Sequence, residues 1–454
     1  MNCLARYICI ASLFFILLSC NSKLDVEPGT SIVPEQIATE TDVEAVILGN
    51  YKSLQHFSAF GERYILIPDM LVNDEMLDFV GTFIPYSEIL RKQQDKTSSI
   101  AEGIWNRGYQ IINTSNLVLS KMDLVSEDNK AAFTAEAKFI RGVTYFMLGG
   151  LFGKPYSAGN TTTNEAVPLV LEPVLNSSDL EKGNKPRATV DAVYKQVLED
   201  LMDAAANLPE DNGTRASRFA AYAFLARVYM AQGNYAEAAA AADMVIASGH
   251  FELNTAFDKA FNNSANSPED VFAIQQNEQS NAGVSNNGLS TFFAASPVGR
   301  GDVQIDSAII DLYEDGDVRK TYFYNGESIT GAVGGYTRKW EKDYGIIPVV
   351  RLAEMYLTRA EANLRNSSAI GDTPLNDVNA VRGRSNASLL DNVTADEVVE
   401  ERRRELAYEG DRYWTVKRLR LDVGARPYDD NKLILPIPQR ERDVNSLLTQ
   451  NDGY

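Results

Sequence analysis

Residues 216–249 read ASRFAAYAFLARVYMAQGNYAEAAAAADMVIASG, and this stretch decides the fold class of the chain. Apolar side chains recur there at the spacing of one helix face, at Ala220, Phe224, Leu225, Val228 and Tyr229. The tripeptide Gln232-Gly233-Asn234 is a turn signal, and an alanine-rich second helix follows from Tyr235. The 34 residues of the stretch equal the period of a tetratricopeptide repeat, which is a helix–turn–helix unit. The stretch therefore predicts two helices whose alanines allow them to pack closely.

Helical periodicity continues outward from this helix pair in both directions. Before it, the sequence predicts helices over residues 41–54, 104–122, 131–151 and 189–208. After it, the segment 353–362 is a weaker echo of the same alanine-rich pattern. These repeats are too few and too irregular for a pure solenoid. The sequence therefore predicts a mostly-α fold built on a tetratricopeptide-like helix-pair scaffold.

Two long stretches, residues 60–100 and 250–345, have a poor helical period and are rich in Asn, Ser, Gly and aromatic residues. Within the second, residues 271–274 and 336–340 are typical of short strands. Loops of such length inside a compact protein are usually functional. We therefore expect a loop-rich, ligand-binding portion containing short strands beside the helical scaffold.

The composition of the chain excludes several classes of function. The 454 residues include 43 basic and 62 acidic side chains, for a net charge of −19, whereas nucleic-acid binding needs clustered basic residues. Any histidine-dependent site would have to use His56 or His250, the only two histidines. All three cysteines lie within the first twenty residues, so the body of the protein has neither a disulfide framework nor a cysteine zinc site. Neither a calcium loop nor a phosphate-binding glycine loop is recognisable, and we expect no cofactor and no metal site.

The N-terminus has the organisation of a lipoprotein signal peptide. A basic residue precedes a twelve-residue apolar run over residues 7–18, which is too short to span a bilayer. The run ends at Leu17-Leu18-Ser19-Cys20, which resembles a bacterial lipobox. We expect a signal peptide over residues 1–19, acylation at Cys20 and a flexible segment over residues 20–40. The alternative is an ordinary cleaved signal with an incidental cysteine.

Two groups of aromatic and polar residues in the loops are candidates for ligand contact. Sugar rings stack their C–H faces on aromatic side chains, while their hydroxyls bond to amides, carboxylates and guanidinium groups. Residues of both kinds occur together at Asn73, Asp74, Phe79, Phe83 and Tyr86, and again at Phe292, Phe293 and Arg300. We interpret these eight as ligand-binding residues, the alternative being that the rings anchor the loops in the core. Trp105, Tyr109 and Trp340 are interpreted as core residues.

The charged segments favour a structural interpretation over a catalytic one. Glu400 and Glu401 are both spaced for an ion pair with Arg404 within one helix. Three other charged residues are interpreted as buried structural partners, namely Arg141, Arg351 and Glu354. Carboxylate neighbours such as Asp74 and Glu75 could serve glycoside hydrolysis, but 62 acidic residues make such neighbours common by chance. No catalytic residue is predicted.

Several motifs occur in order along the chain. Among them are Gly49-Asn50-Tyr51, Trp105-Asn106-Arg107-Gly108-Tyr109, Glu136-Ala137-Lys138-Phe139-Ile140-Arg141-Gly142, Arg351-Leu352-Ala353-Glu354-Met355-Tyr356-Leu357 and Leu435-Pro436-Ile437-Pro438-Gln439. With the lipobox, their order makes the chain similar to the SusD/RagB-like family of outer-membrane nutrient-binding lipoproteins over nearly its whole length. Two departures are Leu18 in the lipobox, where smaller residues are usual, and Asp452, where proline is common.

The resemblance implies a division of the chain after its flexible segment. Residues 41–250 would form a helical N-terminal part with tetratricopeptide-like repeats, and residues 251–454 a C-terminal part with a loop-rich insertion and closing helices. It also implies a lipid-anchored protein on the exterior of the outer membrane. Such a protein acts as a lid over a SusC-like TonB-dependent transporter and delivers oligosaccharide to it.

Four functions are compatible with the sequence. The preferred one is a non-enzymatic, surface-exposed lipoprotein that binds an oligosaccharide and passes it to the transporter. The second has the same architecture with peptide cargo, and the third is a cell-surface glycoside hydrolase. The fourth, a bare tetratricopeptide scaffold, explains the helices but not the long aromatic loops.

Overall fold

The computed structural model describes residues 34–73 and 76–454. The chain divides after Thr39, and residues 40–454 form one compact unit; the described residues before it include the short 3₁₀ helix η3, Pro34–Gln36. The predicted signal peptide, its Cys20 and the first part of the flexible segment lie outside the described residues, as does Asp74. In the described ranges no helix combines the length and the apolar character needed to cross a bilayer.

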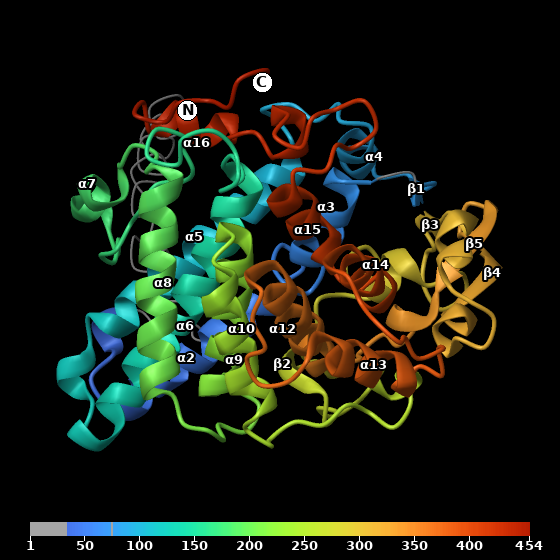
Figure 1. The fold of residues 1–454 in the computed structure, drawn as a ribbon. Coiled ribbons are helices and arrows are strands. Elements are labelled where there is room, and N and C mark those ends of the chain that lie inside the picture. The colour runs from blue at the N-terminus through green and yellow to red at the C-terminus, as the bar shows by residue number, and fades with distance from the viewer. Residues whose placement is uncertain (1–33, 74–75) are drawn as a thin grey trace, which may run out of the picture. The chain divides into compact units, whose positions relative to one another are not determined.

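The long helices predicted from the sequence are present and pack in succession (Figure 1). Their bounds are α2 Glu40–Leu54, α5 Ser99–Leu119, α6 Glu127–Phe152, α8 Val190–Asn207, α9 Arg218–Gln232 and α10 Tyr235–Ile246. Helix α6 packs against α5 and α8, and α9 packs against α8 and α10. The hydroxyls of Ser98, Thr189 and Ser217 cap α5, α8 and α9 by accepting a backbone N–H of the first turn. The predicted mostly-α fold is confirmed.

The helix pair α9–α10 has the turn that its sequence predicts. Gly233 adopts a left-handed conformation with φ of 75°, and its N–H donates to Met230 O at 3.1 Å. The N–H of Asn234 donates to Tyr229 O at 2.9 Å, which completes the closure of α9. Helix α10 packs against both α9 and α12, and its Ala242 side chain is fully buried. Small side chains at this interface let the two helices pack closely, as predicted.

Residues 60–100 contain two helices that the sequence does not predict, α3 Arg63–Leu71 and α4 Ile84–Leu90. All residues of α3 are buried, and Pro68 lies inside it. A helix without a solvent face has no amphipathic period, so the pattern that reveals the other helices is missing here. The interpretation of this stretch as irregular loop is therefore wrong for α3 and α4.

Four further helices complete the scaffold towards the C-terminus. They are α12 Leu352–Asn366, α13 Pro374–Arg384, α14 Ala395–Glu405 and α15 Asp411–Leu419. Helix α12 packs against α10, α13 and α14, and α15 packs against α3 and α9. Three short helices lie apart from this scaffold: α7 Leu180–Gly183, α11 Leu289–Phe293 and α16 Gln439–Val444. The predicted echo at 353–362 corresponds to α12 and is confirmed.

Within the described part of the chain, six short strands form two antiparallel sheets. The larger has the order β1-β3-β5-β4, with β1 Leu77–Phe79, β3 Val303–Ile305, β4 Phe323–Glu327 and β5 Val333–Thr337. The smaller pairs β2 Asp270–Ile274 with β6 Ile347–Arg351. The strand predicted at 271–274 is confirmed. The one predicted at 336–340 ends at Thr337, whose hydroxyl caps the 3₁₀ helix η9, Arg338–Trp340, by accepting from Lys339 N–H.

Buried ion pairs join the elements of the C-terminal half. Arg351 bonds to Glu269 at 2.6 Å and to Glu405 at 2.9 Å, and all three side chains are inaccessible to solvent. Glu354 accepts from Arg227 at 2.6 Å, and Arg404 pairs with Glu401 within α14 at 3.2 Å. Arg141 likewise bonds to Asp200 at 2.7 Å. The structural interpretation of Arg141, Arg351, Glu354 and the α14 pair is confirmed.

Candidate functional site

The two groups of predicted ligand residues meet in space. Phe79 at the end of β1 stacks on Tyr86 of α4, with ring centroids 5.6 Å apart. Phe292 of α11 lies 4.8 Å from Tyr86 and 6.2 Å from Phe83. The Arg300 guanidinium lies over the ring of Phe83, 4.9 Å from its centroid. The structure therefore brings residues of both groups into one cluster, which we call the aromatic cluster: Phe79, Phe83, Tyr86, Phe292 and Arg300.

The predicted ligand residues differ in how far they are buried. Phe79, Tyr86, Phe292 and Phe293 are each at most 5% exposed, so their rings anchor loops in the core. This is the alternative that the sequence left open. Phe83 and Arg300 are only partly buried, and Arg300 also bonds to Asp302 at 2.9 Å. Ligand contact by Phe83 and Arg300 stays a prediction.

A buried carboxylate, that of Glu62, holds the aromatic cluster in place through hydrogen bonds. Glu62, at the start of α3, accepts a short hydrogen bond from the Tyr86 hydroxyl. It also accepts from Gly288 N–H, just before α11, at 2.8 Å. Burial raises the pKa of Glu62 to about 7, against the opposing effect of the neighbouring Arg63 guanidinium. Glu62 thus ties α4 and α11 to the scaffold.

Asn73 shapes the turn that leads into β1. Its side-chain oxygen accepts from the N–H groups of Met76 and Leu77 at 2.9 and 2.8 Å, and its amide donates to Leu77 O at 2.8 Å. A side chain with these three local bonds has little capacity left for a ligand. Asp74, the next candidate along the chain, lies outside the described residues.

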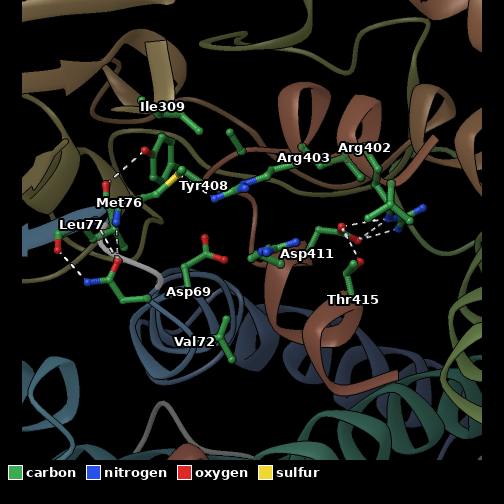
Figure 2. Close-up of a pocket in the computed structure, with 15 residues that line it drawn as sticks. Asp69, Val72, Met76, Leu77, Ile309, Arg402, Arg403, Tyr408, Asp411 and Thr415 are labelled. Carbon is green, nitrogen blue, oxygen red and sulfur yellow. Dashed lines mark hydrogen bonds and ion pairs between the residues drawn. The ribbon is translucent and has the colours of Figure 1, made fainter. Parts of the chain in front are cut away.

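A cavity of about 40 Å³ lies beneath this turn (Figure 2). The carboxyl of Asp69 points into it, accepts Gly410 N–H at 3.1 Å and has a pKa raised by burial to about 8. The Tyr408 hydroxyl donates to Met76 O at 3.3 Å, which fastens the turn onto the segment between α14 and α15. The cavity has room for water but not for a sugar, so we interpret it as structural.

A larger hollow of about 420 Å³ lies at the four-stranded sheet, and we call it the sheet groove. Its lining residues are Leu77, Asp78, Gln304, Ile305, Asp306, Ser307, Ile310, Phe323, Tyr324, Asn325, Gly334, Gly335 and Tyr336. The strand β1 joins the two features, because Asp78 lines the groove and the next residue, Phe79, belongs to the aromatic cluster. Gly335 is needed here, since a Cβ at this position would lie 2.6 Å from Ile305 O.

The sheet groove presents both kinds of group that a hydroxyl-rich ligand requires. Phe323 and Tyr324 are half-buried rings, and Tyr324 is held in place because its oxygen accepts Ala295 N–H at 3.1 Å. The exposed side chains of Ser307 and Asn325 make no hydrogen bond to another of the residues described. Such free hydroxyl and amide groups beside rings can bond to sugar hydroxyls while the rings contact the C–H faces. No group of side chains suited to a metal ion occurs within residues 34–73 and 76–454.

The sequence did not single out the residues of the sheet groove. Leu77 and Asp78 lie within the stretch 60–100 and the others within the stretch 250–345, the two stretches expected to hold ligand contacts, yet none is among the eight candidates. The usable signal is Tyr322-Phe323-Tyr324-Asn325, in which three aromatic residues precede an amide. The same combination of aromatic and amide residues occurs in residues 73–86.

The sequence of the chain matches known families and relatives. Residues 24–230 match the family described as "Starch-binding associating with outer membrane", and residues 307–424 match the one described as "SusD family". SusD-like protein P2 of Formosa agariphila is 28% identical, over 97% of this chain and 98% of its own length.

Solved structures agree with these matches. A putative sugar binding protein from Bacteroides vulgatus superposes with a TM-score of 0.80 at 26% identity, covering 92% of this chain and 99% of its own. Surface glycan-binding protein A from Bacteroides uniformis has the same fold, with a TM-score of 0.75 at 19% identity, covering 91% and 99%. The helical scaffold with its loop-rich sheet is thus the fold of the SusD superfamily. The chain belongs to the SusD/RagB-like family.

Proposed function

We propose that this chain is a surface glycan-binding protein that holds an oligosaccharide in the sheet groove. The observation that carries the proposal is the groove itself, whose lining includes Ser307 and Asn325, with side chains that bond to no other described residue, and the aromatic residues Phe323 and Tyr324. The starch-binding description of the matched family and the glycan-binding name of one relative with the same fold support this choice of ligand.

The wider role that we propose is nutrient capture at the outer membrane. Acylation at Cys20 anchors the chain, with residues 1–19 removed and residues 20–40 as a flexible connection to the helical and loop-rich parts, 41–250 and 251–454. The chain acts as the lid of a SusC-like TonB-dependent transporter and releases its oligosaccharide to it. The outer-membrane association named in the family description supports this role.

Calorimetry with a panel of host and plant heptasaccharides tests the ligand class, starting from maltoheptaose because the matched family is described as starch-binding. Asn325→Ala is expected to weaken the binding of the active heptasaccharide by about threefold to tenfold, the effect of losing one hydrogen bond. The exposed Asn366→Ala, on α12, is the matched control and should bind as the unmodified chain does. Equal binding by all three proteins would contradict the assignment of the groove.

Two carboxylates in the groove, Asp78 and Asp306, make a glycoside hydrolase the second candidate. Both already accept backbone N–H groups, from Phe79 and Ala308 respectively. We therefore expect no reducing ends after prolonged incubation with any glycan that binds. Turnover that Asp78→Asn abolishes would favour the enzyme instead, and binding of peptides but of no glycan would favour peptide cargo.

A further inference from the structure

A second large hollow lies on the helical side of the molecule, away from the sheet. It has a volume of about 590 Å³ and is bounded by α5, the segment 168–184 that includes α7, and α16. We call it the helix groove. Figure 1 shows α5, α7 and α16 on the side of the scaffold opposite to strands β3, β4 and β5. The two grooves therefore do not form one continuous site.

Tyr109, which is half-buried, lines the helix groove and is held rigidly, and the neighbouring Trp105 is 3% exposed and belongs to the core. Trp105 and Tyr109 of α5 lie side by side, with ring centroids 4.9 Å apart. The Tyr109 hydroxyl donates to Pro168 O at 2.8 Å. The Asn113 amide donates to Val174 O at 2.9 Å and its oxygen accepts Val174 N–H at 2.7 Å. These bonds fasten the outer wall to α5, so the groove exists before any ligand arrives.

The rim of the helix groove carries unused amide groups. The side chains of Asn106, Gln110 and Asn184 make no hydrogen bond to any other residue in the described part of the chain. Apolar groups flank them on both walls, where Leu180 is 56% and Val444 is 71% exposed. Amides that can donate and accept, set between apolar groups, match a ligand with alternating hydroxyl and C–H surfaces.

The charges at the rim are paired or engaged within the protein. Arg440 bonds to Glu102 at 3.3 Å, and Glu441 accepts a hydrogen bond from the Trp105 side chain. Arg440 is the one basic residue among the described residues that line the hollow. An acidic saccharide would find no surplus of positive charge there, so the surface is suited to an uncharged ligand.

We propose that the helix groove is a second binding surface for neutral oligosaccharides. The proposal rests on the proposed function, since it assigns the same class of ligand to a separate site. A polysaccharide that contacts both grooves would be held more tightly than by either groove alone. The same holds for a glycan particle in which one sugar chain contacts each groove. The helix groove would then keep long glycans at the surface while the sheet groove binds the cargo.

The test compares three proteins: the mature chain, an Asn106→Ala/Gln110→Ala double variant of the helix groove, and a Ser307→Ala/Asn325→Ala double variant of the sheet groove. Calorimetry with the heptasaccharide panel is expected to give two sites for the mature chain and one for each variant. In affinity gels containing the parent polysaccharide, the helix-groove variant should be retained at least tenfold less. The substituted side chains are solvent-accessible, and melting curves check that both variants are folded. Asn184→Ala, on the opposite wall, is expected to weaken the same site.

The outcomes separate the two proposals. If the helix-groove variants leave the number of sites and the gel retention unchanged, the helix groove is not a binding surface, and the sheet groove is unaffected by that result. If the sheet-groove variant binds normally while the helix-groove variants lose all binding, the second surface holds and the proposed site in the sheet is wrong. Absence of binding to every glycan in the panel overturns both.

Discussion

Asp69 is a carboxyl group that the fold keeps almost entirely from solvent. It is 7% exposed, and its pKa rises from 3.8 to about 8, chiefly because burial disfavours the charged form. Between these values the unfolded chain releases this proton and the folded chain keeps it. The contribution of Asp69 to the free energy of unfolding is therefore full at low pH and is lost as the pH rises towards 8.

Asp69→Asn should remove this dependence. We expect the variant to gain about 1–3 kcal/mol relative to the unmodified chain at pH 8, and to lose that advantage at pH 4, because an amide stays neutral at both. Urea unfolding at the two pH values measures the difference. Asp391→Asn, at an exposed carboxylate, is the control. Parallel pH profiles for Asp69→Asn and the unmodified chain would contradict the buried, protonated state.

At the scale of residues, the sequence could predict chemistry better than position. The aromatic residues that it proposes for ligand contact lie in two distant stretches, and the contact between Phe83 and Phe292 joins them. It could not predict that Phe292 is fully buried while Phe83 is not, because that depends on how α11 packs under α4. Asn325 was not predicted as a ligand-binding residue for the same reason, because only the pairing of β4 with β5 places it in a groove.

At the scale of elements, the helix pair α9–α10 offers a direct test of the scaffold. Ala242 is fully buried, whereas Ala240, two residues earlier on the same helix, is exposed. Ala242→Leu should reduce the free energy of unfolding by about 1–3 kcal/mol, because the larger side chain overfills a close interface. Ala240→Leu adds the same atoms on the solvent side and should change it by less than about 0.5 kcal/mol. Equal effects in chemical denaturation would show that α10 does not pack through this face.

Elements were predictable where one face of a helix meets water. The segments α2, α5, α6 and α8 to α10 all carry that periodicity, and each was found. The helix α3 has no polar face and was missed, and the strand expected at 336–340 was cut short by the cap that Thr337 provides. The pattern thus identified the long helices of the N-terminal half and α12, whereas α3, α4, α13 and α15 were not predicted.

At the scale of the whole molecule, Glu405 connects distant parts of the chain. It accepts from Arg351 at the end of β6 at 2.9 Å, from Arg319 at 3.1 Å, and also from Arg384 of α13. Three arginines lower the pKa of this buried carboxyl against the effect of burial. The group is therefore charged in the folded protein.

Glu405→Gln should destabilise the chain by about 3–5 kcal/mol, because it leaves buried guanidinium groups without their counter-charge. Asp396→Asn, at a side chain that is 98% exposed in the same helix, should cost less than about 0.5 kcal/mol. Thermal melting of the two variants is the measurement. A melting temperature of Glu405→Gln within a degree of the control would contradict a structural role for the charged stretch in α14.

The sheet groove is proposed to hold an oligosaccharide. The most direct measurement is a crystal structure of the chain soaked with the heptasaccharide that binds in calorimetry. We expect sugar density in the sheet groove, with hydroxyls bonded to Ser307 and Asn325 and a ring face against Phe323 or Tyr324. Density confined to other surfaces, with the sheet groove empty at a saturating concentration, would contradict it.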